Sequence, residues 1–193
     1  QLLKADKSER CPVECPKKES RIHFFKTPDA PSLLTWLSEQ SAVQSAPLAF
    51  LLNLGAIYLD GKRQLGDQSL KQGQILRVHT QPRRFCFDPS KFREFLVFQT
   101  EDFVVANKPT HLPVHPTLDN AKENLLYQLS SGLGVTLYPV HRLDIETSGL
   151  LVLGKKAAFQ QAFHKLLKQP ETRKRYCALT RQPVPIGAHT HYM

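Results

Sequence analysis

The stretch best suited to chemistry is HRLDIETSGLLVLGKK, residues 141–156, where one carboxylate, Asp144, lies two positions after Arg142. Residues two apart on an extended segment face the same side. A neighbouring cation favours the ionised form of a carboxylate, and an ionised carboxylate in a cleft can act as a nucleophile or a base. Arg-x-Asp is also a common surface ion pair, so this pair alone does not establish catalysis.

The overall charge indicates an anionic partner. The 193 residues contain 26 Lys and Arg against 17 Asp and Glu, a formal net charge of +9. Such an excess is typical of nucleic-acid binding, although a surface rich in lysine would give the same count. No apolar run approaches the roughly 18 residues that cross a bilayer. No membrane partner is therefore expected.

The first residues of the chain and its cysteines indicate the cellular compartment. The first residues lack the long apolar core of a signal peptide. Four cysteines are too few for a disulfide scaffold, which favours a reducing compartment, the cytoplasm or an organelle matrix. Cys11 and Cys15 have no second cysteine pair with zinc-site spacing, so no metal is expected.

A compact unit is predicted over residues 21–80, after a flexible arm over residues 1–20. Apolar spacing predicts a helix over 32–40 with Ser32 as its N-cap. A second helix is predicted over 47–55, which begins with proline and ends with glycine. Asp60-Gly61 predicts a hairpin turn, and a further strand is expected over 75–79.

Two predicted helices are followed first by GAIYLDGKR and then by LKQGQILRV. This order resembles the S-four-like RNA-binding module. The resemblance implies that the unit binds RNA, with Lys62, Arg63 and Arg77 along a phosphate backbone. A small α/β module with ordinary surface charges is the alternative.

A linker over residues 81–95 is expected to lead into a second domain over residues 96–193. Strands are predicted over 95–99 and 102–108, a helix over 120–134 and a strand in GLLVLG. The helix predicted over 156–169 should turn Phe159, Phe163, Leu166 and Leu167 inward. A strand is expected at KRYCAL, residues 174–179.

Three motifs of this second domain resemble the RluA family of pseudouridine synthases. VVANKPTHLPVHP (104–116), HRLDIETSGLLVLGK (141–155) and KRYCAL (174–179) occur in the order expected for that family. The resemblance implies an α+β fold, in which an S-four-like module precedes a mixed, mostly antiparallel sheet with flanking helices. It also implies the isomerisation of specific uridines to pseudouridine in structured RNA, without a cofactor.

The resemblance assigns roles to individual residues. Asp144 matches the catalytic aspartate of the family, and Arg142 matches the arginine that fills the space left in the RNA by the flipped base. Tyr176 matches the tyrosine that stacks on that base. The basic run at the third motif would lie along RNA phosphates: Arg173, Lys174 and Arg175.

Other residues of the motifs are expected to support the site. Lys108 and His115 belong to the first motif, where contact with the substrate is possible, and His141 should support the loop. Thr147, Ser148 and Gly149 should shape the turn after Asp144, with their hydroxyls bonded to backbone.

One segment of the family pattern is not found in these residues. The family continues past the tyrosine strand to an Arg-x-His-Gln-x-Arg segment, whose arginine pairs with the catalytic aspartate, and nothing here matches it. The expectation is that the C-terminal portion of the domain is missing or shortened, which makes activity of these residues alone uncertain.

Two alternatives remain open at this point. The chain could be a catalytically silent RNA-binding protein with the same fold. A glycoside or nucleoside hydrolase of small molecules is a third hypothesis, but a small neutral substrate would not need the basic hairpin. Ribosomal RNA and transfer RNA are both substrates within the family, so the RNA is not specified.

Overall fold

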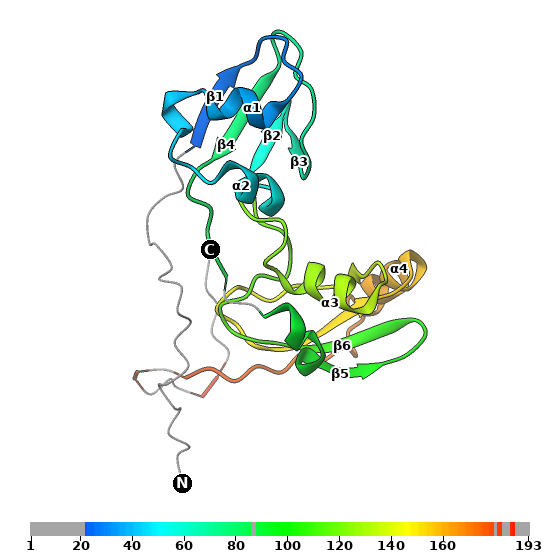
Figure 1. The fold of residues 1–193 in the computed structure, drawn as a ribbon. Coiled ribbons are helices and arrows are strands. Elements are labelled where there is room, and N and C mark those ends of the chain that lie inside the picture. Colours follow the sequence, from blue (N-terminus) through cyan, green and yellow to red (C-terminus); the bar gives the residue numbers. More distant parts are fainter. Residues whose placement is uncertain (1–21, 86–87, 180, 183–185, 188–193) are drawn as a thin grey trace.

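The computed structural model describes residues 22–85, 88–179, 181–182 and 186–187. The expected N-terminal arm, including Cys11 and Cys15, lies outside the described residues. Two units follow one another along the chain, each built on a four-stranded antiparallel sheet (Figure 1). This confirms a mixed α and β fold. No helix among the described ranges is long and apolar enough to cross a membrane.

The first sheet has the strand order β1-β4-β2-β3. The hairpin forms as predicted, with Asp60 and Gly61 at φ values of 48° and 76°, both in the left-handed region that its turn requires. The sequence did not predict β1, because its residues alternate only between exposed and half-buried and its strand state depends on pairing with β4. The strands are β1 (Ile22–Lys26), β2 (Ile57–Leu59), β3 (Lys62–Gln64) and β4 (Ile75–His79).

Two helices of the first unit pack on this sheet. In α1 (Leu33–Ser38) the Ser32 hydroxyl accepts the Thr35 N–H at 3.0 Å, which confirms the predicted N-cap. A one-turn helix, η1 (Ser41–Val43), leads to α2 (Leu48–Leu54), which ends at Gly55 in the left-handed conformation. Their apolar faces meet the sheet in one core, which contains Leu33, Leu37, Leu51, Ile57, Leu76 and Val78.

The second sheet has the order β5-β6-β8-β7. Its central pair is continuous, and Lys108 at the end of β6 lies opposite Gly149 at the start of β8. The loop that follows β6 and the loop that precedes β8 therefore meet at one edge of the sheet. The strands are β5 (Leu96–Gln99), β6 (Phe103–Lys108), β7 (Tyr138–Pro139) and β8 (Gly149–Gly154).

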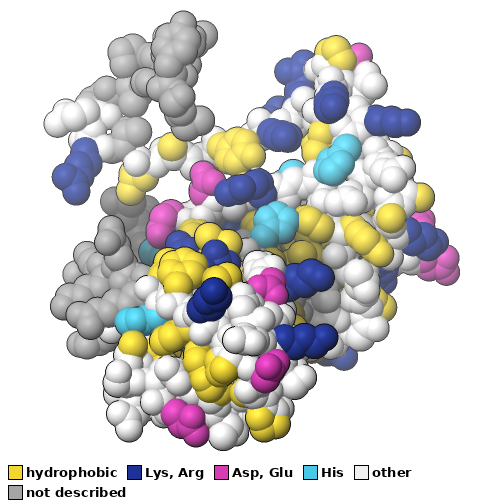
Figure 2. Space-filling view, turned by 90° about the horizontal axis from the view of Figure 1, so that it is seen from above, with side chains coloured by type: hydrophobic (Ala, Val, Ile, Leu, Met, Phe, Trp, Pro, Cys, Tyr) yellow, Lys and Arg dark blue, Asp and Glu magenta, His cyan; other side chains and the backbone are white. Residues whose placement is uncertain are grey.

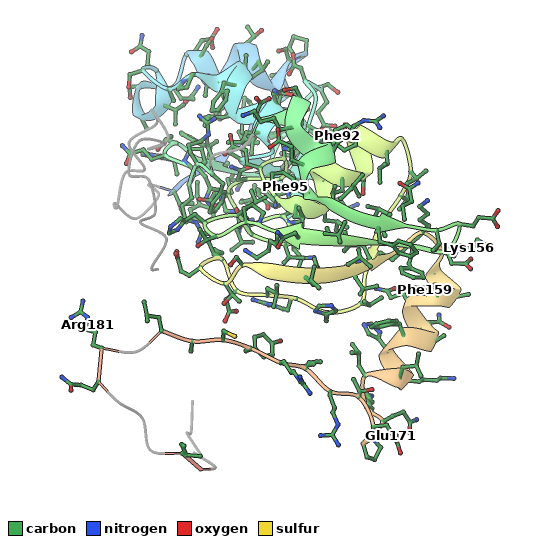
Figure 3. All side chains as sticks on the ribbon, turned by 90° about the horizontal axis from the view of Figure 1, so that it is seen from below. Phe92, Phe95, Lys156, Phe159, Glu171 and Arg181 are labelled. Atoms are coloured by element: carbon green, nitrogen blue, oxygen red, sulfur yellow. The ribbon has the colours of Figure 1, made fainter. Side chains whose placement is uncertain are left out.

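Helix α3 (Leu125–Leu133) covers one face of this sheet, as Figure 1 shows. It ends at Gly134, while Gly132 lies inside the helix, where a Cβ would come within 2.5 Å of the Phe92 ring. The segment interpreted as a linker contains η2 (Pro89–Phe95), and Phe92 and Phe95 pack on the second core beside α3 (Figure 3). This part of the segment is thus packed on the second unit.

Helix α4 (Ala157–Leu166) is anchored at its first turns only. Phe159 stacks on Phe103 of β6 with ring centroids 5.0 Å apart, and Phe163 stacks on Phe159. Leu166 is 57% exposed, so the prediction that it faces inward is wrong. The same end of the helix contacts β7, where the Gln160 side chain donates to the Pro139 carbonyl at 2.7 Å.

The strand predicted at 174–179 is also not formed. Residues 173–179 have no strand pairing and are all exposed. Figure 3 shows the chain after Glu171 running as an extended segment away from the end of α4. A strand needs a hydrogen-bonded neighbour, and no described strand pairs with this segment.

Candidate functional site

A small pocket lies where the loop after β6 meets the loop before β8. Its volume is about 170 Å³, room for a single ring rather than a whole nucleotide. One wall comes from the loop after β6 and the other from the segment around the central motif. The lining residues are Pro113, Val114, His115, Pro116, Thr117, Arg142, Leu143 and Ile145.

Asp144 sits between two lining residues of this pocket, and its side chain is exposed. Its backbone is held by a turn in which the Thr147 N–H donates to the Asp144 carbonyl at 3.1 Å. The next carbonyls are also engaged, because the Thr110 hydroxyl donates to that of Glu146 at 2.9 Å. A fixed backbone with a solvent-facing carboxylate suits a group that meets a ligand.

Arg142 does not pair with Asp144. No ion pair joins the two side chains in the part of the chain that the structure describes, so the surface ion pair that was the alternative for Arg142 is not formed. The segment from 142 to 144 is irregular rather than a strand, and the same-side rule for extended residues does not decide its geometry. Arg142 instead lies near His115, across the pocket.

Lys108 lies beneath the loop that carries Asp144. Its side chain is completely buried, and its Nζ donates to the carbonyls of Pro109 at 2.8 Å, Leu112 at 2.7 Å and Ile145 at 3.1 Å. Burial lowers the pKa of Lys108, and the charges of Glu146 and Asp144 oppose that shift. Lys108 thus joins the two loops from below, and its predicted role in supporting the site remains a prediction.

Each loop carries one half-buried histidine. Burial lowers the pKa of His115, and the Arg142 charge lowers it further. Burial also lowers the pKa of His141, with a smaller effect from Lys174. The Val152 N–H donates to Nε2 of His141 at 3.2 Å, so this neutral imidazole ties the start of the central motif to β8.

The turn residues after Asp144 act through backbone rather than side chain. Gly149 has φ 129°, a conformation that favours glycine, and it starts β8. The Thr147 N–H makes the turn bond, but no hydrogen bond of the Thr147 or Ser148 hydroxyl occurs among the described residues. The expectation that these hydroxyls bond backbone is therefore wrong.

The third motif is not brought to the pocket. Tyr176 is 66% exposed and does not line it, and its three basic neighbours are likewise exposed. Lys174 is close enough to His141 for its charge to lower the pKa of that histidine. The roles assigned to Tyr176, Arg173, Lys174 and Arg175 remain predictions.

The three basic residues predicted to bind RNA in the first unit differ in their surroundings. Lys62 is exposed and lines a polar hollow of about 590 Å³ with Arg63 and Lys71. The guanidinium groups of Arg63 and Arg77 lie against the Tyr58 ring, 4.9 and 4.1 Å from its centroid. Figure 2 shows Lys and Arg side chains at several separate places on the face seen there, interleaved with hydrophobic ones.

Sequence reasoning missed a buried polar cluster in residues 117–124. Asp119 and Glu123 form ion pairs with Arg83 and Arg84, at 3.3 and 2.6 Å. Burial would raise the pKa of Asp119, but hydrogen bonds from Arg83 and Thr117 hold it below its usual range. The run TLDNAKEN lies between two apolar segments and is rich in turn-forming residues. This pattern could have indicated an ordered polar turn at residues 117–124.

No group of three or more His, Cys, Asp or Glu side chains in the described ranges could hold a metal ion. The residues around the pocket offer a carboxylate, an arginine and a neutral histidine. Such groups can act through positioning, charge and proton transfer.

Comparison with known proteins gives the site a context. Residues 102–192 match the family model described as RNA pseudouridylate synthase. The chain is 35% identical over 131 residues to "RNA pseudouridine synthase 6, chloroplastic" of Oryza sativa subsp. japonica, which covers 66% of this chain and 27% of that protein. It is 36% identical over 125 residues to an uncharacterized RNA pseudouridine synthase of Helicobacter pylori (strain J99), covering 62% and 43%.

A third relative is "Ribosomal large subunit pseudouridine synthase D" of Neisseria meningitidis, 29% identical over 146 residues, which covers 72% of this chain and 39% of that protein. The chain thus spans less than half the length of each of these curated relatives.

Proposed function

Residues 102–192 match the RNA pseudouridylate synthase model, and we propose that this chain belongs to that family and serves the isomerisation of uridine to pseudouridine in RNA. The observation that carries the proposal is Asp144, an exposed carboxylate on a fixed turn beside a ring-sized pocket. The family resemblance of its motif and the match of residues 102–192 support the same role.

The reaction breaks the bond between uracil N1 and ribose C1′ and forms a bond between C5 and C1′. The proton lost from C5 is balanced by the proton gained at N1, so no co-reactant is needed. Breaking a glycosidic bond calls for a carboxylate against an electron-poor anomeric centre. Asp144 is proposed to act on the ribose or on the uracil ring, while the pocket keeps the detached base close to the sugar.

The uridine must leave its stack to reach such a pocket. Arg142 at the pocket wall is proposed to fill the vacated space in the RNA, and Tyr176 to stack on the base. In the structure Tyr176 lies outside the pocket, so its role requires the 173–179 segment to approach the site when RNA is bound.

The first unit is proposed to be an S-four-like module that holds RNA, with Lys62 as its exposed basic contact. Arg173, Lys174 and Arg175 would extend the same phosphate track. Ribosomal RNA is the first candidate because one relative is named for the large ribosomal subunit, with transfer RNA as the second. The chloroplastic rice relative makes an organelle matrix a candidate compartment beside the cytoplasm.

The test replaces Asp144 by Asn in the whole protein and measures pseudouridine in an RNA transcript by chemical mapping. We expect Asp144→Asn to abolish pseudouridine formation and to leave RNA affinity nearly unchanged. Glu146→Gln is the matched control, because it removes an exposed carboxylate two residues away on the same turn. Unchanged turnover in Asp144→Asn would contradict the proposal.

A further inference from the structure

The first unit reaches across to the loop that forms one wall of the pocket. From β3, Arg63 donates through Nη1 to the Gly55 carbonyl at 2.5 Å and through Nη2 to the Thr117 carbonyl at 2.6 Å. The Tyr58 hydroxyl of β2 donates to the neighbouring Leu118 carbonyl at 2.7 Å. Thr117 itself lines the pocket, so the contact of the first unit ends at the pocket wall.

The backbone of the two units is in direct contact beside Arg63. The Ala121 N–H donates to the Leu54 carbonyl at the end of α2, at 2.7 Å. A Cβ at Gly55 would lie 2.8 Å from the Ala121 Cβ and 2.9 Å from the Arg63 Cδ. Figure 1 shows α2 at the edge of the first unit that faces the second. There is no free space at this contact, so a displacement of the first unit would displace the second unit as well.

The groups that hold Arg63 are themselves fixed. Tyr58 is 6% exposed, and the guanidinium groups of Arg63 and Arg77 both lie against its ring. A cation over a tyrosine ring is attracted to it, and the attraction strengthens as water is excluded. The Arg63 side chain is therefore oriented before any RNA binds.

We propose that Arg63 is a positioning residue, which clamps the loop 113–117 through the Thr117 carbonyl and so holds His115 opposite Arg142. On this view the first unit sets the shape of the pocket in addition to any RNA that it binds. The inference rests on the proposed function for its catalytic consequence, but the clamp is a property of the folded chain that can be measured without activity.

The geometry distinguishes this role from a phosphate contact. Arg63 uses two donors of its planar fork on two carbonyls that belong to different units. Lysine would keep the positive charge but not the fork, because its ammonium group is a compact point charge. Lys62, its neighbour on β3, is exposed. Its substitution therefore serves as the control for loss of a positive charge without loss of the clamp.

The experiment compares Arg63→Lys, Arg63→Ala, Tyr58→Phe and Lys62→Ala in the whole protein. Hydrogen exchange of the amides in residues 117–122, with Ala121 as the reporter, measures the clamp. RNA affinity and the separate kcat and KM for pseudouridine formation measure its consequence. Circular dichroism and thermal unfolding identify any variant that fails to fold.

We expect Arg63→Lys to speed exchange at Ala121 and to lower kcat by about tenfold, because misplacement of a wall by less than 1 Å is costly to positioned reactions. Its RNA affinity should stay close to that of the unmodified protein. Tyr58→Phe should give the same pattern more weakly, since it removes one hydrogen bond. Lys62→Ala should weaken RNA binding without changing exchange at Ala121.

Unchanged exchange in both Arg63 variants would overturn the inference. So would full recovery of kcat by Arg63→Lys, which would assign Arg63 to charge alone. If the unmodified protein makes no pseudouridine at all, the proposed function fails, while the exchange data still decide whether Arg63 clamps the loop. If Arg63→Ala does not fold, Arg63→Lys and Tyr58→Phe still test it.

Discussion

The two loops that form the pocket are held in different ways. The loop 109–117 is fixed from below by the buried Lys108, which also donates to Ile145 of the other loop, and it alone is fixed from the first unit by Arg63. The loop 141–148 is fixed through its backbone, while Arg142 and Asp144 project their charges without an ion pair among the described residues. One loop thus behaves as a wall, and the other presents the groups proposed to react.

This difference follows from the cost of burying charge. A buried cation must find acceptors for its donors, and Lys108 finds three backbone carbonyls. An exposed carboxylate has no such requirement and can remain available for a ligand. Substitutions in the first loop should therefore change stability, and substitutions in the second loop should change activity.

The largest effect is expected for Lys108→Met. The substitution leaves three carbonyls without their buried donor, which should lower the free energy of unfolding by roughly 3 kcal/mol. Urea unfolding checks the value, with Asp144→Asn as the control from the other loop, where little change is expected. An unchanged free energy of unfolding in Lys108→Met would show that the buried Lys108 does not stabilise the loops.

The second largest effect is expected for His141→Phe. The substitution removes the Nε2 acceptor, so the Val152 N–H loses this hydrogen-bond partner at a half-buried position. The free energy of unfolding should fall by about 1 kcal/mol. Pseudouridine formation should fall as well, because His141 begins the segment that carries Asp144. Thermal unfolding and turnover together test this, and His164→Phe on the exposed face of α4 is the control.

A third prediction concerns pH. His115 and His141 have pKa values lowered from the ordinary 6.5 mainly by burial. Well above pH 6.5 both histidines are neutral in the folded and the unfolded protein. Below pH 6.5 the unfolded protein binds the protons first, so the free energy of unfolding should fall as pH falls toward the folded pKa values.

Urea midpoints at pH 7.5 and 5.5 measure this loss of stability. The double variant His115→Gln, His141→Gln should show a smaller difference between the two pH values than the unmodified protein. His79 of β4 is also buried, with a lowered pKa, and should account for part of the loss that remains. An identical difference in both proteins would rule out the two loop histidines as its source.

The smallest effect is expected at the contact between His111 and Glu146, which joins the two loops in the described structure. Nδ1 of His111 lies 2.7 Å from a Glu146 carboxylate oxygen, but both side chains are 73% exposed. Exposed pairs contribute little, so Glu146→Gln should change stability by less than about 0.5 kcal/mol. Thermal unfolding at low and high salt tests this, and a large salt-dependent loss would mean that the pair holds the loops together.

Much of the local structure could be predicted from residue types. Ser32, Gly55 and the Asp60-Gly61 turn have conformational requirements that depend on few neighbours, and the structure confirms each of them. The strands of GLLVLG and DFVVANK followed from apolar pattern in the same way. The failures are of another kind: β1 and the segment 174–179 depend on whether a partner strand lies beside them, which their own residues do not encode.

The sequence by itself determined the chemistry available to this protein. It placed Asp144, Arg142 and Lys108 in motifs that resemble those of one family, and it predicted a separate role for each of them. Only the tertiary structure decided how those groups are held, because the acceptors of Lys108 and Arg63 are backbone carbonyls. Every residue carries such a carbonyl, so no residue type marks one, and only the fold selects which carbonyls face a buried cation.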